Sequence, residues 1–309
     1  MLVSPFPPSL SQRFEAGIAG LAYGGLAYQT APEPQTGPPN SVQRAIDRFW
    51  QRFHDQITQV SQLDRPLSTL LEISSLKTSA PESQIPGFQT PDPLDWFWLS
   101  DLPWLWMLLQ EPEGQREWLK QQPDPRLVLL LSAFEDLSHD LNHGGFSQAR
   151  GTHSIDRFPV SSCPAIQPVW AVAVDLIQRS VSLAQGIAHW QTTETLLHLS
   201  PDLKKIGIAL WLAWRSDRVS LTLAFAQQIS NINDRLGAEQ RFSNWAGLLP
   251  LAGLMGGFAN APFPWSLISG LDRAALQQQS DRLFGAWAGH YMPNPISCPL
   301  PCFNGPTKA

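Results

Sequence analysis

Charged residues are scarce in this chain of 309 residues, where Asp, Glu, Lys and Arg together make up 15% of the sequence. The formal net charge is −5, and Lys and Arg are scattered rather than gathered in a dense basic run. A nucleic-acid-binding domain is expected to carry a basic patch or stripe. The composition therefore argues against a nucleic acid as the partner.

Cysteines and long apolar runs are also few. The three cysteines, Cys163, Cys298 and Cys302, do not make a disulfide framework, and the last two have no nearby His at zinc-ligand spacing. Unpaired thiols are typical of a reducing cytoplasm. No apolar run reaches the ~18 residues of a membrane-spanning helix, and the N-terminus shows no signal-peptide pattern. We therefore expect a cytoplasmic protein without membrane insertion.

Strand-like alternation is nearly absent, whereas apolar residues recur at helical spacing along most of the chain. The pattern predicts an all-α fold. We expect one domain at 12–291, an N-terminal extension at 1–11 and a proline-rich tail at 292–309. Pro250 should kink or split the helix that contains it. The predicted helices span 12–28, 42–60, 66–76, 96–110, 113–122, 125–141, 167–189, 192–199, 201–216, 218–232, 241–259, 263–270 and 272–289.

Tryptophan is abundant, with thirteen residues in the chain. Four of them lie close together: Trp96, Trp98, Trp104 and Trp106. Rings of this size most often pack in a core. The alternative is an exposed aromatic anchor for a protein partner. Core packing is the favoured interpretation.

Imidazoles and carboxylates gather at the end of the helix predicted at 125–141 and in the loop that follows. Two of the histidines stand four residues apart, a spacing that can hold a metal ion on one helix face. The segment has no His-Glu-x-x-His pattern and no obvious third ligand, so a polar helix terminus is the favoured interpretation. The residues are Asp136, His139, Asp140, His143, His153 and Asp156.

Two glycine-rich apolar segments, at 13–28 and 246–265, carry most of the information in the sequence. Small residues stand at helical spacing in both: Ala16, Gly20 and Gly24 in the first, Ala252 and Gly256 in the second. Small residues three or four apart share one helix face and let another backbone approach closely. We therefore predict that these positions lie at tight helix contacts in the interior.

The first segment, RFEAGIAGLAYGGLAY, resembles the opening motif of the ADP-ribosylglycohydrolase family, Arg-x-x-Gly-x-x-x-Gly-x-Ala-x-Gly-Asp-Ala-Leu. The matching residues are Arg13, Ala16 in place of the first Gly, Gly20, Ala22, Gly24, Gly25 in place of Asp, Leu26 and Ala27. The second segment is similar to the end of the family domain, an Ala/Gly-rich helix followed by Pro262 and Trp265. The resemblance implies a single compact domain of orthogonally packed helices.

Active members of this family are expected to bind two Mg²⁺ ions through an early Thr-Asp-Asp-Thr and a late Asp-Thr-Asp-Thr motif. The early motif corresponds best to 99–102, where Ser100 and Asp101 are flanked by leucines. The late motif should fall at 239–243, where Glu239 is the single carboxylate and Arg241 follows it. Mg²⁺ prefers oxygen ligands, mainly carboxylates. We therefore expect a site that binds no metal.

The leading hypothesis is an ADP-ribosylglycohydrolase-like protein that has lost catalysis and serves as a binding or regulatory module, with a protein or an ADP-ribose-like ligand as its partner. A hydrolase of ADP-ribose glycosidic bonds with a reduced metal site, and a structural subunit of a larger assembly, remain alternatives. The expected remnants of the cleft are Ser100, Asp101, Asp234, Glu239 and Arg241. We expect Asp101 and Glu239 to approach each other and Arg241 to pair with Asp101 in place of a metal ion.

Overall fold

Helices make up the secondary structure of the residues that the computed structural model describes, namely 8–30, 41–62, 94–121, 124–139, 163–193, 196, 198–234, 247–265 and 271–289. No strand occurs within these ranges, which confirms the all-α prediction. The helices are α1 (Leu10–Thr30), α2 (Ser41–Ser61), the 3₁₀ helix η3 (Phe97–Asp101), α3 (Leu102–Leu108), α4 (Pro112–Lys120), α5 (Pro125–His139), α7 (Gln167–Gln178), α8 (Leu183–Thr192), α9 (Pro201–Arg215), α10 (Val219–Asp234), α11 (Leu248–Ala259) and α12 (Arg273–Trp287).

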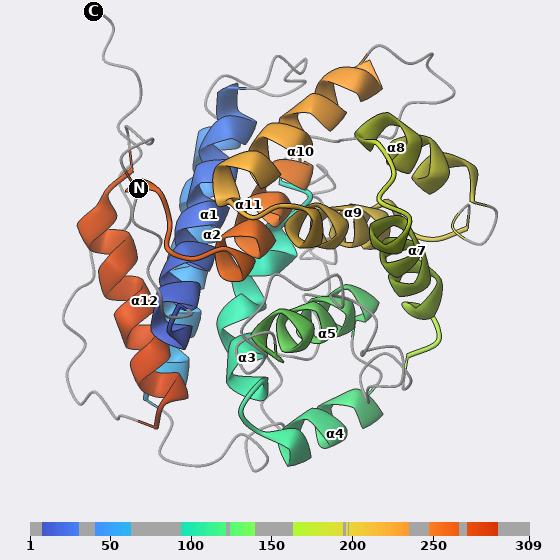
Figure 1. Ribbon diagram of the computed structural model, residues 1–309. Helices are drawn as coiled ribbons and strands as arrows, with labels where there is room; N and C mark the ends of the chain where they lie inside the picture. The colour runs from blue at the N-terminus through green and yellow to red at the C-terminus, as the bar shows by residue number, and fades with distance from the viewer. Residues whose placement is uncertain are drawn as a thin grey trace, which may run out of the picture.

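The centre of the molecule is the contact between α1 and α11, which lie side by side (Figure 1). A Cβ on Gly20 would collide with the carbonyl oxygen of Gly253, and a Cβ on Gly253 would collide with that of Gly20. Gly24 meets the Leu249 carbonyl in the same way. The two backbones therefore touch directly, and the predicted close contacts of the small residues are confirmed. Glycine is required at these positions because no side chain fits.

Two further predicted small residues also lie in the interior. Ala252 is fully buried in the core. Gly256 faces α10, where a Cβ would lie 2.8 Å from the side chain of Thr222. The helix α11 thus packs its small residues against α1 on one side and α10 on another.

Arg13 joins the ends of two helices at this contact. Its Nη1 donates hydrogen bonds to the carbonyl oxygens of Leu137 (3.0 Å) and Phe258 (3.1 Å), near the C-termini of α5 and α11. The side chain is buried, with 5% exposed. The last carbonyls of a helix lack intrahelical partners and carry partial negative charge, so a buried guanidinium stabilises both ends.

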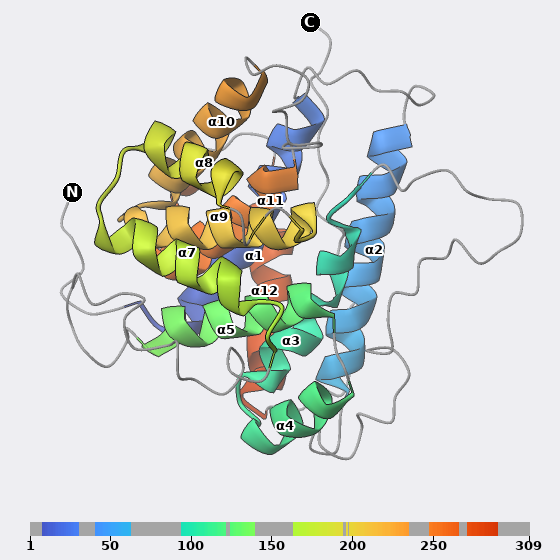
Figure 2. The same cartoon turned by 90° about the vertical axis from the view of Figure 1, so that its right-hand side faces the viewer.

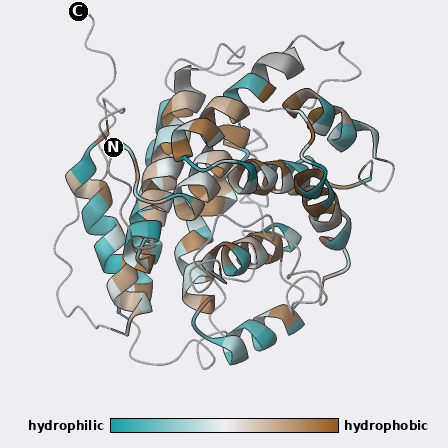
Figure 3. Ribbon diagram, in the orientation of Figure 1, coloured by the Kyte–Doolittle hydropathy of each residue, from teal (hydrophilic) through white to brown (hydrophobic). Residues whose placement is uncertain are grey.

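The remaining helices surround this pair. The helices α9 and α10 pack against α11, and α12 packs against α1 and α2. Figure 2 shows α9 crossing the direction of α2, so the bundle is not a set of parallel helices. Hydrophilic residues gather along α4 and α12, whereas α11 in the centre is mainly hydrophobic (Figure 3). No helix within the described ranges is long and apolar enough to cross a membrane.

The tryptophan cluster belongs to the core. Trp96, Trp98, Trp104 and Trp106 are 1%, 6%, 4% and 0% exposed, respectively. The interpretation as an exposed aromatic anchor is therefore wrong for these four residues. Burial of large apolar rings explains them without a partner.

Several predicted helices differ from the observed ones. The helix predicted at 96–110 is a 3₁₀ helix, η3, followed by the short α3. The helix predicted at 192–199 is not observed in its described residues, because α8 ends at Thr192.

The helix expected at 167–189 is divided into α7 and α8, because Ser182 and Gln185 form a reciprocal capping box that starts a new helix. Pro250 neither kinks nor splits α11, since the helix begins at Leu248 and the proline lies in its first turn. Backbone N–H groups of the first turn have no intrahelical partner, so proline is tolerated there. Residues 241–246 lie outside the described ranges.

Candidate functional site

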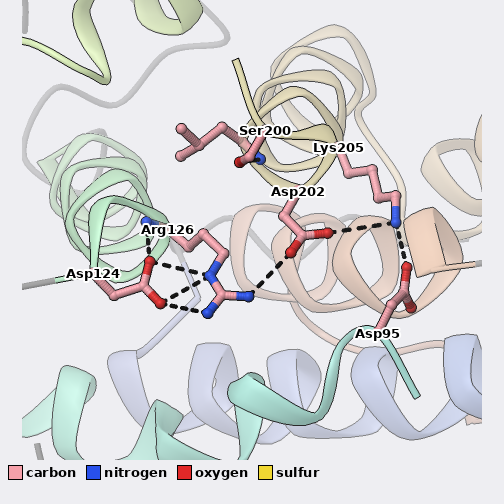
Figure 4. Close-up of polar contacts among 7 residues, drawn as sticks. Asp95, Asp124, Arg126, Ser200, Asp202 and Lys205 are labelled. Carbon is pink, nitrogen blue, oxygen red and sulfur yellow. Dashed lines mark hydrogen bonds and ion pairs between the residues drawn. The ribbon is translucent and has the colours of Figure 1, made fainter. Parts of the chain in front are cut away.

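A row of five charged side chains lies between α5, α9 and the segment that leads into η3 (Figure 4). Arg126 donates from Nε (2.8 Å) and Nη2 (2.5 Å) to Asp124 Oδ2, and from Nη1 to Asp202 Oδ2 (3.0 Å). Lys205 Nζ lies 3.5 Å from Asp202 Oδ1 and pairs with Asp95 Oδ2. Charges alternate along this row, from Asp124 to Asp95. We call these five residues the charge row.

Helix starts position the charge row. Asp124 immediately precedes α5, and its Oδ1 accepts a hydrogen bond from the backbone N–H of Arg126 (2.9 Å). Asp202 lies in the first turn of α9, where Ser200 Oγ accepts from the backbone N–H of Leu203 (3.4 Å). Carboxylates are stabilised near helix N-termini by the helix dipole. The helix N-termini therefore favour the charged forms of Asp124 and Asp202. Arg126 then forms ion pairs with both carboxylates.

A second ion pair binds the same segment to α2. Arg52 Nη2 donates to Asp101 Oδ1 at 3.0 Å, and the Asp101 side chain is only 5% exposed. Asp95 and Asp101 thus connect one short stretch of chain to α9 and to α2. Two of the cations also lie over aromatic rings of this stretch, Arg126 over Trp98 (4.8 Å) and Arg52 over Phe97 (5.4 Å). Such contacts add cation–π attraction to the ion pairs.

Burial has the largest influence on the pKa values of Asp95 and Asp101. It raises the pKa of Asp95 above its ordinary value, while the charge of Lys205 and its hydrogen bond act in the opposite direction. It likewise raises the pKa of Asp101, with Arg52 opposing and Asp124 adding to the rise. A charged carboxylate loses solvation on burial, and one cation compensates this loss only in part.

Aromatic rings fill the space around Gly25, the position at which the family motif has an aspartate. A Cβ on Gly25 would lie 3.3 Å from the Trp96 ring. Trp106 lies equally close to Gly17 on the same helix. The glycines of α1 are therefore covered by Trp96, by Trp106 of α3 and by the backbone of α11.

The structure describes only part of the predicted site. Ser100 and Asp101 lie in η3, directly before α3, and both are buried. The Ser100 hydroxyl has no hydrogen-bond partner in the described part of the chain. Asp234 is the last residue of α10. Glu239 and Arg241 lie outside the described residues, so their predicted approach to Asp101 stays a prediction. The described partner of Asp101 is Arg52.

The other candidate metal ligands form no metal-binding group within the described residues. No group of three His, Cys, Asp or Glu side chains there is arranged to hold a metal ion. Cys163 is free and half-buried. The remaining cysteines and the residues His143, His153, Asp140 and Asp156 lie outside the described ranges.

Sequence reasoning missed the charge row and Arg52. A partial signal was present, because Asp124-Pro125 and Ser200-Pro201-Asp202 are both typical helix starts and place carboxylates at N-termini. No signal indicated that Arg126, Lys205 and Asp95 would meet. Pairing partners separated by 76 and 110 residues carry no local pattern.

Comparisons of the chain with protein-family models, with curated proteins and with solved structures find no match. The resemblance to ADP-ribosylglycohydrolases therefore rests on the motifs quoted above. Chemically, the described arrangement offers carboxylates that already have cationic partners.

Proposed function

We propose that this protein is a non-catalytic relative of the ADP-ribosylglycohydrolases that acts as a binding or regulatory module without metal ions. One observation supports the proposal above all others. Asp101, the acidic residue left in the expected early metal motif, is buried and paired with Arg52. A guanidinium carries a fixed charge and geometry, and it satisfies a buried carboxylate without a metal ion.

The packing around Gly25 supports the same proposal. The family aspartate at this position would need room beside α1, and the Trp96 ring occupies that room at the distance of a Cβ contact. Loss of a carboxylate and filling of the adjacent space go together. Both changes argue against a hydrolase that uses two metal ions to orient ribose and water.

The partner classes are a protein or an ADP-ribose-like ligand held without metal. An exposed tryptophan surface would favour a structural subunit. The clustered tryptophans are buried and give no such support. The net charge of −5 continues to argue against nucleic acid.

Calorimetric titration with Mg²⁺ and Mn²⁺ tests the proposal, together with a hydrolysis assay on an ADP-ribosylated peptide. We expect no stoichiometric metal isotherm and no release of ADP-ribose. Tight binding of about one or two ions that Asp101→Asn abolishes would overturn the proposal. A parallel titration with ADP-ribose in EDTA separates the partner classes, since binding there favours the nucleotide ligand and its absence favours a protein.

A further inference from the structure

The charge row carries more negative than positive charge. Three carboxylates, Asp124, Asp202 and Asp95, alternate with two cations, Arg126 and Lys205. Asp202 lies between both cations, whereas each terminal carboxylate has one cationic neighbour in the row. The row as a whole therefore holds one uncompensated negative charge, and a terminal carboxylate is the natural place for a proton.

Asp95 and Asp124 have equally exposed side chains, at 21% each, but Asp95 Oδ1 is buried and has no hydrogen-bond partner in the described part of the chain. From α9 it faces Lys205, with Asp202 as the nearest like charge. From the start of α11 it faces the uncharged backbone of Gly247, where a Cβ would lie 2.5 Å from Asp95 Oδ1. Asp124, in contrast, accepts hydrogen bonds on both oxygens. Oδ2 accepts from Arg126 Nε and Nη2, and Oδ1 accepts from Arg126 Nε and from the Arg126 backbone N–H.

We propose that Asp95 is a proton-binding site through which mild acid strengthens the folded state of this domain. The proton would neutralise the surplus charge of the row and leave Lys205 paired with Asp202. The neutral carboxyl would also need less solvation at Oδ1, which is buried beside Gly247. The proposal concerns how folding responds to pH and does not depend on the proposed binding function.

The sign of the effect follows from linkage. Burial raises the pKa of Asp95 in the folded chain above its value in the unfolded chain. Between these two values the folded state binds more protons, so the folding equilibrium constant rises as pH falls and levels off below the unfolded value. An exposed, ion-paired carboxylate with a lowered pKa gives the opposite trend, since acid then removes its stabilising charge.

Urea denaturation at a series of pH values from 7.5 to about 4.5 tests the proposal on the full chain, in three forms: wild type, Asp95→Asn and Asp217→Asn. Asp217 is a matched control because its side chain is 55% exposed. For one proton taken up, the folding equilibrium constant changes by up to about tenfold per pH unit. Because the lowered pKa of His54 gives the opposite trend over the same pH range, the test is the difference between variants. We expect Asp217→Asn to keep the wild-type slope and Asp95→Asn to take up as much as one proton fewer on folding towards acid. Equal slopes in the wild type and Asp95→Asn would overturn the proposal.

A direct titration covers the case in which Asp95→Asn fails to fold. The carboxyl ¹³C resonance of Asp95 in the folded wild type should titrate at a higher pH than an ordinary aspartate, which titrates near 3.9. A midpoint at or below that value would contradict the proposal. Asp101 titrates in the same direction and serves as an internal comparison.

Discussion

The α1–α11 contact and the charge row both join segments that are far apart in the sequence, but they do so by opposite means. In the first, side chains are absent, and the backbones of Gly20 and Gly253 touch. In the second, long side chains reach across the gap between helices, as Arg126 does towards Asp202. The first contact has no room for an added atom. In the second, several ion pairs stabilise the contact, so the loss of one leaves the others in place. We therefore expect substitutions in the first region to be the more damaging.

The largest effect is expected from a single methyl group at the α1–α11 contact. Gly20→Ala should lower the free energy of unfolding by about 3 kcal/mol, because the new Cβ would collide with backbone that cannot move aside cheaply. Gly114→Ala in α4 is the matched control, since its Cβ would meet side chains rather than backbone, the nearest atom being a carboxylate oxygen of Glu111 at 3.2 Å. Urea denaturation measures both. A Gly20→Ala protein as stable as Gly114→Ala would show that the backbones are not in contact.

Arg13→Met removes a charged link at the same contact. The substitution should lower the free energy of unfolding by about 2 kcal/mol, because the carbonyls of Leu137 and Phe258 lose a charged donor while the methionine keeps most of the apolar volume. Hydrogen exchange should increase at the C-terminal turns of α5 and α11 together. Faster exchange at one of these ends alone would show that Arg13 stabilises a single helix.

Arg52→Met probes the second region. It leaves the buried Asp101 without its cation and should lower the free energy of unfolding at pH 7 by roughly 1–2 kcal/mol, less than a fully buried pair because Arg52 is 29% exposed. The loss should shrink towards acid, since a protonated Asp101 no longer needs a partner. Arg48→Met is the matched control on the exposed side of α2. If Arg52→Met and Arg48→Met lower the free energy of unfolding equally at every pH, the effect of Arg52 does not depend on Asp101.

The smallest effect is expected at a surface ion pair. Lys120 and Glu117 lie 2.6 Å apart, but their side chains are 69% and 53% exposed. Lys120→Ala should change the free energy of unfolding by less than about 0.5 kcal/mol, because water screens exposed pairs. A change as large as that of Arg52→Met in the same urea series would mean that burial does not set the strength of ion pairs in this protein.

Much of the helical framework was predictable. The observed α2, α5, α9 and α12 each start or end within about two residues of the predicted helices, a normal uncertainty at helix ends. The division between α7 and α8 was missed although its capping box, Ser182 with Gln185, is a local signal. The apolar periodicity continues across the break between α7 and α8, and it therefore predicted one continuous helix. The four clustered tryptophans were placed correctly in the core because large apolar rings favour burial.

The sequence by itself determined the all-α class and the tight packing of the glycine-rich helices. Both depend on periodicity and on side-chain size, which are properties of neighbouring residues. Only the tertiary structure decided which cation meets which carboxylate. Arg52 and Asp101 are 49 residues apart, and Lys205 and Asp95 are 110 apart. The strength of an ion pair depends on the distance between the two charges and on their burial. The local sequence pattern specifies neither quantity.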